Sequence, residues 1–167
     1  SILNMELDPH GRFVYVAVSN ANGLYRFDVE KSEWKTIRPS TAGTDVSALY
    51  VEQDGSLVIG TGGRISSMLS WTGMFRSTDQ GDSWVEVNVR DAGETLHPRI
   101  GAIQSTSDGR LIASFVRYSN DKPSGIFIEQ SDGKWINVTD DGAPPSLMVV
   151  SGELIYYVKN YTGTVTY

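Results

Sequence analysis

The chain has 167 residues, 40% of them hydrophobic, which fits one globular domain or one part of a larger one. It has no cysteine, which excludes disulfides, thiolate nucleophiles and cysteine-ligated metals. With 14 basic and 20 acidic residues, a formal net charge of -6 and no cluster of Lys and Arg, the chain lacks the electrostatic footprint of a nucleic-acid partner. No apolar run is long enough to span a membrane, so we expect neither a nucleic-acid nor a membrane partner.

In chain order, the first predicted elements are short runs rich in β-branched and aromatic residues, which are typical of strands: residues 12–18, 56–61 and 110–115. A tight turn with glycine precedes each of these runs and a fourth one at residues 153–158: His10-Gly11, Asp54-Gly55, Asp108-Gly109 and Ser151-Gly152. No segment of eleven or more residues keeps a helical apolar period. These patterns predict an all-β chain.

Two further strands follow each of the first three runs. One begins at a glycine, at Gly23, Gly73 and Gly125, and the next begins at a tryptophan, at Trp34, Trp84 and Trp135. The tryptophans lie 50 and 51 residues apart. A repeat of about 50 residues with four strands is the pattern of a β-propeller blade.

The repeat predicts a single partial β-propeller over residues 1–167, with about three and a half four-stranded antiparallel blades. We expect complete blades at about residues 1–38, 45–89 and 99–139, and an incomplete blade at residues 145–167. Propellers close with about four to eight blades, because an open arc exposes apolar faces and strand edges. We therefore expect the chain to be a fragment of a longer propeller, or another chain or a second copy to complete the ring.

The segment from Ser77 to Trp84 reads STDQGDSW. It resembles the Asp-box, or BNR repeat, of sialidases, xyloglucan-degrading glycosidases, sortilin-like receptors and photosystem assembly factors. All fixed positions of that pattern match: Ser77, Asp79, Gly81, Ser83 and Trp84. The corresponding segment of the first repeat keeps only the tryptophan, and that of the third keeps Asp-Gly and the tryptophan with one residue fewer.

A structural role for this segment is favoured over a catalytic one. A carboxylate two residues before a glycine accepts hydrogen bonds from its own turn, as Asp79 is placed to do, and Gly81 takes a conformation that a Cβ would strain. Trp84 is expected to pack the hairpin onto apolar neighbours. In the families with this resemblance, the box lies away from the active face.

Candidate ligand residues lie instead in the segments between the predicted strands. Arg99-Ile100-Gly101 resembles the Arg-Ile-Pro stretch of sialidases, in which an arginine grips the carboxylate of the substrate, although Gly101 replaces the proline; a surface or inter-blade arginine is the alternative. Arg117 and Trp71 are further candidate ligand contacts, and Asp45 and Asp121 are candidate catalytic carboxylates.

The other motifs give no site. The glycine-rich run 60–63 is not followed by the helix that a phosphate cradle requires, and we interpret it as an inter-strand loop. His10 and His97 lie far apart without the short spacing typical of a zinc pair. We therefore expect no metal and no cofactor.

Two classes of function remain. The first is a glycan-binding propeller, or part of a sialidase-like glycoside hydrolase whose site this chain alone does not complete. The second is a non-catalytic propeller that binds protein, like the assembly factors and receptors that share the repeat. The resemblance favours the first class, with a carbohydrate ligand and an extracellular or periplasmic location.

Overall fold

The computed structural model describes residues 2–18, 23–39, 46–61, 73–91, 94–96, 99–116, 124–139, 145–152 and 154–159. Every regular element within these ranges is a β-strand, which confirms the all-β prediction. The strands are β1 (Ile2–Leu7), β2 (Phe13–Val18), β3 (Leu24–Asp28), β4 (Glu33–Ile37), β5 (Val46–Val51), β6 (Leu57–Thr61), β7 (Gly73–Ser77), β8 (Val85–Val87), β9 (Val89–Asp91), β10 (Glu94–Leu96), β11 (Arg99–Ser105), β12 (Leu111–Val116), β13 (Gly125–Glu129), β14 (Trp135–Asn137), β15 (Pro145–Ser151) and β16 (Leu154–Lys159).

The strands form three four-stranded antiparallel sheets, and the order within each sheet follows the chain. The first sheet is β1–β4, the second β5–β8 and the third β11–β14. A two-stranded antiparallel sheet, β15–β16, follows them. A small hairpin of β9 and β10, which the repeat did not predict, lies between the second and third sheets in the chain.

The same register recurs at the start of each sheet. The first strand carries a bulge near its beginning, between Ile2 and Asn4, Val46 and Ala48, Ile100 and Ala102, and Pro145 and Leu147. Because the bulge recurs at the same place in all four sheets, residues in different sheets can be compared position by position, counting from the bulge.

Apolar cores lie between successive sheets, because alternate side chains of a strand point to opposite faces. The first core joins the first and second sheets, with Tyr15 and Leu49 among its buried members. The second core joins the second and third sheets, around Val58 and Phe127. A smaller third core joins the third sheet to β15 and β16. Each sheet is therefore held mainly by its neighbours.

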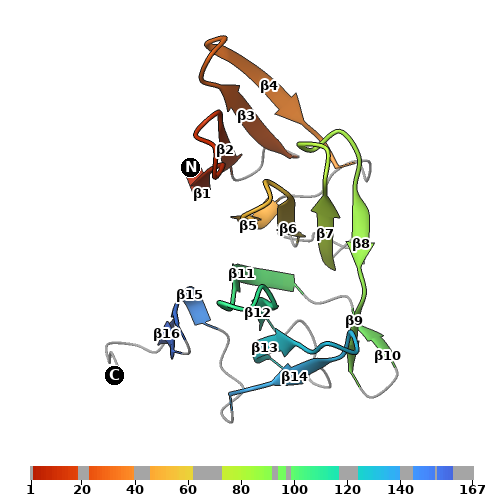
Figure 1. The fold of residues 1–167 in the computed structure, drawn as a ribbon. Helices are drawn as coiled ribbons and strands as arrows, with labels where there is room; N and C mark the ends of the chain where they lie inside the picture. Colours follow the sequence, from red (N-terminus) through yellow and green to blue (C-terminus); the bar gives the residue numbers. More distant parts are fainter. Residues whose placement is uncertain are drawn as a thin grey trace.

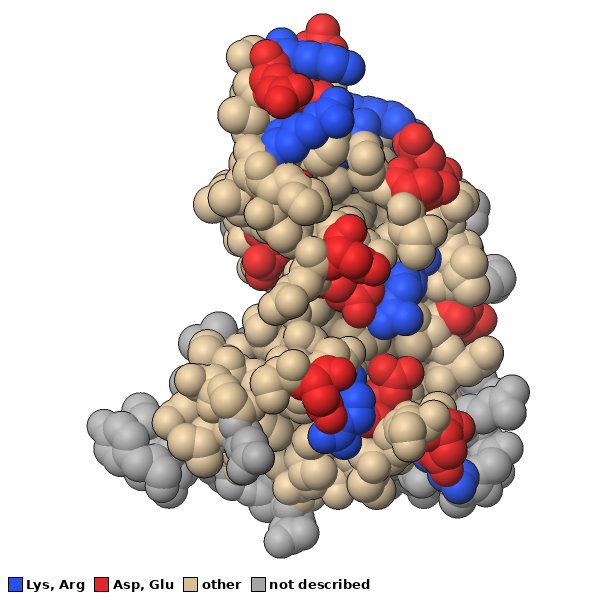
Figure 2. All heavy atoms as spheres, viewed as in Figure 1, with Lys and Arg blue, Asp and Glu red and all other residues tan. Residues whose placement is uncertain are grey.

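Figure 1 shows the sheets following one another in an arc, with β1, β5, β11 and β15 along its left side. Direct contacts join β1 to β5, β5 to β11 and β11 to β15, so the first strands of the sheets form a continuous row. On the face drawn in Figure 2, acidic and basic side chains lie next to one another instead of gathering by sign.

Candidate functional site

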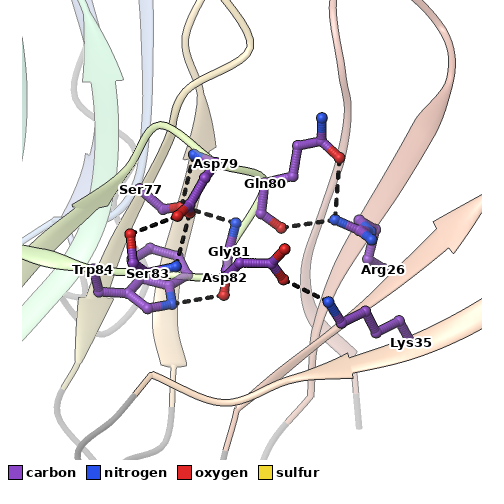
Figure 3. A network of polar contacts seen from close by, with 9 residues as sticks. All are labelled: Arg26, Lys35, Ser77, Asp79, Gln80, Gly81, Asp82, Ser83 and Trp84. Carbon is purple, nitrogen blue, oxygen red and sulfur yellow. Dashed lines mark hydrogen bonds and ion pairs between the residues drawn. The ribbon is translucent and has the colours of Figure 1, made fainter.

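The turn between β7 and β8 contains the segment that resembles an Asp-box, and its polar groups bond to one another (Figure 3). Asp79 Oδ1 accepts hydrogen bonds from the backbone N–H of Ser83 and from Ser77 Oγ, both at 2.8 Å. Asp79 Oδ2 accepts from Ser83 Oγ at 2.5 Å. Ser77 Oγ accepts from the N–H of Gly81 at 2.8 Å, and Trp84 Nε1 donates to the Gly81 carbonyl at 3.1 Å. All five residues that carry the resemblance take part in this network.

These hydrogen bonds stabilise the ionised form of the Asp79 carboxyl. The side chain and backbone of Ser83, followed by the Ser77 hydroxyl, lower the pKa of Asp79 to about 2. A general acid needs a pKa near the working pH. Asp79 therefore stays ionised at neutral pH, with its oxygens already bonded within the turn.

Polar groups of the same turn also reach the first sheet. Arg26 Nη1, on β3, donates to the Gln80 carbonyl at 3.0 Å and to Gln80 Oε1 at 3.3 Å. Lys35 Nζ, on β4, lies 2.5 Å from Asp82 Oδ1. Figure 3 shows both cations pointing from the first sheet toward the turn. The turn is thus an inter-sheet contact as well as a hairpin.

Close packing under the turn requires a glycine. Gly81 has a φ of 94°, in the region that L side chains rarely adopt, and a Cβ built on it would lie 2.7 Å from Cγ2 of Ile37. Ile37 is the last residue of β4 and is 2% exposed. Trp84 is partly buried against the core of which Ile37 is a member.

The sequence motif did not indicate the first-sheet residues of this contact, Arg26, Lys35 and Ile37. Each lies on a strand, and the turn residue that it meets is 44 to 54 positions later in the chain. A local motif carries no signal for such a partner. Aligning the first repeat with the second by their glycine and tryptophan positions would have placed these three residues on the strands next to the turn, and that alignment is the signal that could have found them.

The connections of each four-stranded sheet differ between its two ends. Strand pairing places the turns between the first and second strands and between the third and fourth strands at one end. The chain passes between the second and third strands, and onward to the next sheet, at the other end. The turn 77–84 lies at the first kind of end. We call the second kind of end the connection end.

The connection ends of the second and third sheets lie next to each other, as two contacts between their first strands show. Ser47, near the start of β5, donates from Oγ to the carbonyl of Ile100, near the start of β11, at 2.6 Å. Tyr50 and Ser105, toward the ends of the same strands, join through their hydroxyls at 2.6 Å. The two strands therefore run in the same direction, with their starts adjacent.

The sequence-predicted ligand and catalytic residues belong to these connections. Arg99 is the first residue of β11, and only its backbone lies within the described part of the chain. Asp45 immediately precedes β5, Trp71 lies between β6 and β7, and Arg117 and Asp121 lie between β12 and β13. These four residues lie outside the described residues.

A cavity lies between the third sheet and β15–β16, at the end where the turn between the first and second strands lies. Its apolar wall includes Ile112, Ile128 and Ile155, which belong to the third core. On its polar rim, Arg110 Nε lies 2.8 Å from Asp108 Oδ2. Since this charged pair is engaged with itself, we interpret the cavity as a gap in inter-sheet packing.

The described residues contain no group of three or more His, Asp or Glu side chains that could hold a metal ion. No helix that could cross a membrane occurs in the part of the chain that the structure describes.

No protein-family model and no curated protein matches this sequence. Solved structures do match its fold. The extracellular domain of the putative one component system BT4673 from B. thetaiotaomicron matches with a TM-score of 0.66 and 15% identity, over 96% of this chain and 20% of that one. A puromycin hydrolase S511A mutant complexed with PGG matches with a TM-score of 0.65 and 14% identity, over 95% of this chain and 25% of that one. Kuenenia stuttgartiensis hydrazine synthase matches with a TM-score of 0.56 and 16% identity, over 80% of this chain and 35% of that one.

These similarities confirm the predicted fold class: the chain is all-β and has the four-stranded antiparallel sheets of a β-propeller. It spans between a fifth and about a third of the length of the three matched chains. At 14 to 16% identity, the similarity concerns the fold and not the activity.

Proposed function

We propose that this chain is part of an Asp-box-type β-propeller that binds a carbohydrate at the connection ends of its sheets. The observation that carries the proposal is the adjacency of the starts of β5 and β11, joined by the 2.6 Å hydrogen bond from Ser47 to Ile100. Asp45 directly precedes one of these strands and Arg99 begins the other. A carboxylate and a guanidinium supplied by neighbouring connections are hydrogen-bonding groups suited to a sugar, and the guanidinium more so to a sugar acid.

The chemistry of the candidate residues agrees with this ligand class. Arginine binds carboxylates with two parallel hydrogen bonds, and Arg99 and Arg117 supply that group. Trp71 supplies an aromatic face for the apolar side of a sugar ring. Glycoside cleavage requires two carboxyl groups, for which Asp45 and Asp121 are the candidates in this chain.

The box belongs to the proposal as a structural element. Its residues use their polar groups within the turn and toward the first sheet, at the end of the second sheet opposite to its connections. The assignment to the Asp-box type rests on the match of Ser77, Asp79, Gly81, Ser83 and Trp84 together with this hydrogen bonding.

A glycan array followed by affinity measurement tests the ligand. We expect binding to at least one glycan, with a loss of about tenfold or more for Arg99→Ala and for Asp45→Ala, since each removes a charged hydrogen-bonding group. Asp132→Ala, at an exposed turn at the opposite end of the third sheet, is the matched control and should bind normally. Absence of binding to any sugar, or binding that survives both substitutions, would contradict the proposal.

An extracellular or periplasmic location is part of the same proposal. The matched BT4673 domain is described as extracellular, and glycans are abundant outside cells. Antibody labelling of cells that express the full protein should detect it on intact cells, or after opening of the outer membrane alone. Labelling that requires lysis or opening of both membranes would contradict this location.

A further inference from the structure

One apolar position of the first strand recurs in all four sheets, and it is buried in every sheet except the first. The second residue after the bulge of each first strand is Met5, Leu49, Ile103 or Met148. Leu49, Ile103 and Met148 are 0%, 2% and 3% exposed, because each packs against the preceding sheet. Met5 is 61% exposed. Within the described residues, the face of the first sheet that carries Met5 has no sheet packed on it.

A second position, on the second strand of each sheet, is buried in every sheet except the last. It comes one residue before the residue that pairs with Met5, Leu49, Ile103 or Met148, and is occupied by Tyr15, Val58, Ile112 and Tyr156. Tyr15, Val58 and Ile112 are at most 1% exposed, whereas Tyr156 is 57% exposed. The side chain of Tyr156 lies on the face of β15–β16 that points away from the third sheet, because its neighbours Ile155 and Tyr157 pack toward that sheet.

The two positions meet in every inter-sheet core of the molecule. One residue of each kind is present in each core: Tyr15 with Leu49, Val58 with Ile103, and Ile112 with Met148. The same combination of positions therefore occurs in three cores, with three different pairs of apolar side chains. Met5 and Tyr156 are its two unused halves.

The exposed residues around Met5 and Tyr156 are also apolar. Ile2, Leu7 and Trp34 are 65%, 59% and 62% exposed in the first sheet, and we call them, with Met5, the leading face. Val149 and Leu154 are 52% and 59% exposed beside Tyr156, and we call these three the trailing face. By strand pairing and alternation, the members of each face point to one side of their sheet, and exposed apolar side chains gathered on one side are a liability in water unless another surface covers them.

The two strands β15 and β16 suffice to contact the first strand of another sheet. In the observed interfaces, the first strand of a sheet contacts the first two strands of the sheet before it: β5 contacts β1 and β2, β11 contacts β5 and β6, and β15 contacts β11 and β12. A first strand such as β1 therefore finds in β15 and β16 the two strands that the interface uses.

We propose that the leading face of one copy of this chain binds the trailing face of a second copy, head to tail, with Met5 packed against Tyr156. The occupant is a second copy because this chain carries both halves of an interface that it already forms three times. The contact is heterologous, so copies add in one direction and either close a ring or continue as a filament.

Sedimentation velocity on two variants tests both the contact and its direction. Met5→Lys disrupts only the leading face, and Tyr156→Glu disrupts only the trailing face. We expect the unmodified chain to associate and each variant alone to be a monomer. An equimolar mixture should form a one-to-one dimer, because the intact trailing face of the Met5→Lys chain meets the intact leading face of the Tyr156→Glu chain.

The controls separate this contact from unfolding and from general stickiness. Both residues are more than half exposed, so the melting temperatures of the variants should match that of the unmodified chain at a protein concentration low enough to dissociate it. Val85→Lys, at a position that is 71% exposed on β8 and outside both faces, should associate like the unmodified chain. A monomeric unmodified chain, self-association of either variant, or a mixture without dimer would overturn the proposal.

Discussion

The turns that precede Trp84 and Trp135 occupy the same place in the second and third sheets, but they contact the preceding sheet differently. The turn 77–84 reaches the first sheet through Gln80 and Asp82, and Trp84 remains partly buried. In the turn 130–134, Asp132 accepts from the Lys134 N–H at 3.1 Å and pairs with Lys134 Nζ at 2.7 Å. Its bonds are local.

The tryptophan compensates for the shorter turn. Trp135 is 2% exposed and belongs to the second core, whereas Trp84 is held by the hydrogen bond from its Nε1 to Gly81. Buried Trp135 Nε1 has no hydrogen-bond partner among the described residues. One sheet is thus secured by a polar turn and its partner contacts, and the other by apolar burial of an aromatic ring.

The largest expected difference concerns the tryptophans themselves. Trp135→Ala should lower the free energy of unfolding by about 3 to 5 kcal/mol, because it leaves a large cavity in the second core. Trp34→Ala should have a much smaller effect in the isolated monomer, since Trp34 is 62% exposed and its ring lies tilted against that of Phe27, at 4.9 Å between ring centroids. Urea unfolding of both variants measures the difference, and equal losses would show that burial does not separate these positions.

Glycine substitutions should separate the two turns next. Gly81→Ala should cost about 2 to 4 kcal/mol, from left-handed backbone strain together with the clash against Ile37. Gly133→Ala should cost only about 1 to 2 kcal/mol, because its φ of 77° is strained but no atom lies within 4 Å of the added Cβ. Thermal unfolding compares them. A Gly81→Ala chain that is no less stable than Gly133→Ala would show that the close contact with Ile37 is unimportant.

The repeat made the strand order and the sheets predictable, but not the burial of the tryptophans. The turn glycines and the spacing of the tryptophans indicated the strand order and the four-stranded sheets, because turn chemistry and alternation are local properties. They did not indicate that Trp34, Trp84 and Trp135 would differ in burial. Trp34 has no sheet packed before it among the described residues, whereas Trp84 and Trp135 each have one and differ in the turn that leads to them. The spacing of the tryptophans carries neither signal.

The candidate site shows the same division. Ser77 and Asp79 could be paired with their turn from the sequence, since donor and acceptor lie within four residues. The contacts of Arg26 and Lys35 depend on how two sheets pack, and sequence spacing does not specify them. The ligand roles of Trp71 and Arg117 and the catalytic roles of Asp45 and Asp121, all outside the described residues, stay predictions.

Acid should weaken the turn 77–84 through Asp79. Because the folded state lowers the pKa of Asp79 to about 2, its ionised form contributes stability that is present above the unfolded-state pKa of about 4 and is lost as the pH falls toward 2. Asp79→Asn should therefore melt a few degrees below the unmodified chain at pH 6, and the gap should narrow between pH 5 and 2. Asp132→Asn is the comparison: Lys134 lowers the pKa of Asp132, so its gap should narrow in the same direction as the pH falls. A gap for Asp79→Asn that stays constant with pH would contradict the hydrogen-bonded carboxylate.

The smallest expected effect is that of the Lys35–Asp82 ion pair between the first and second sheets. The two side chains are 51% and 58% exposed, so solvent and salt screen their attraction. A double-mutant cycle with Lys35→Met and Asp82→Asn should give a coupling energy of about 0.2 to 1 kcal/mol at low salt, falling in 1 M NaCl. The pair Lys134 and Asp132 within the third sheet, measured in the same way, is the local counterpart. If the first cycle gave a coupling of several kcal/mol, the charged contact would rank with the apolar core in joining the two sheets, and the distinction between the polar turn and the buried tryptophan would have to be revised.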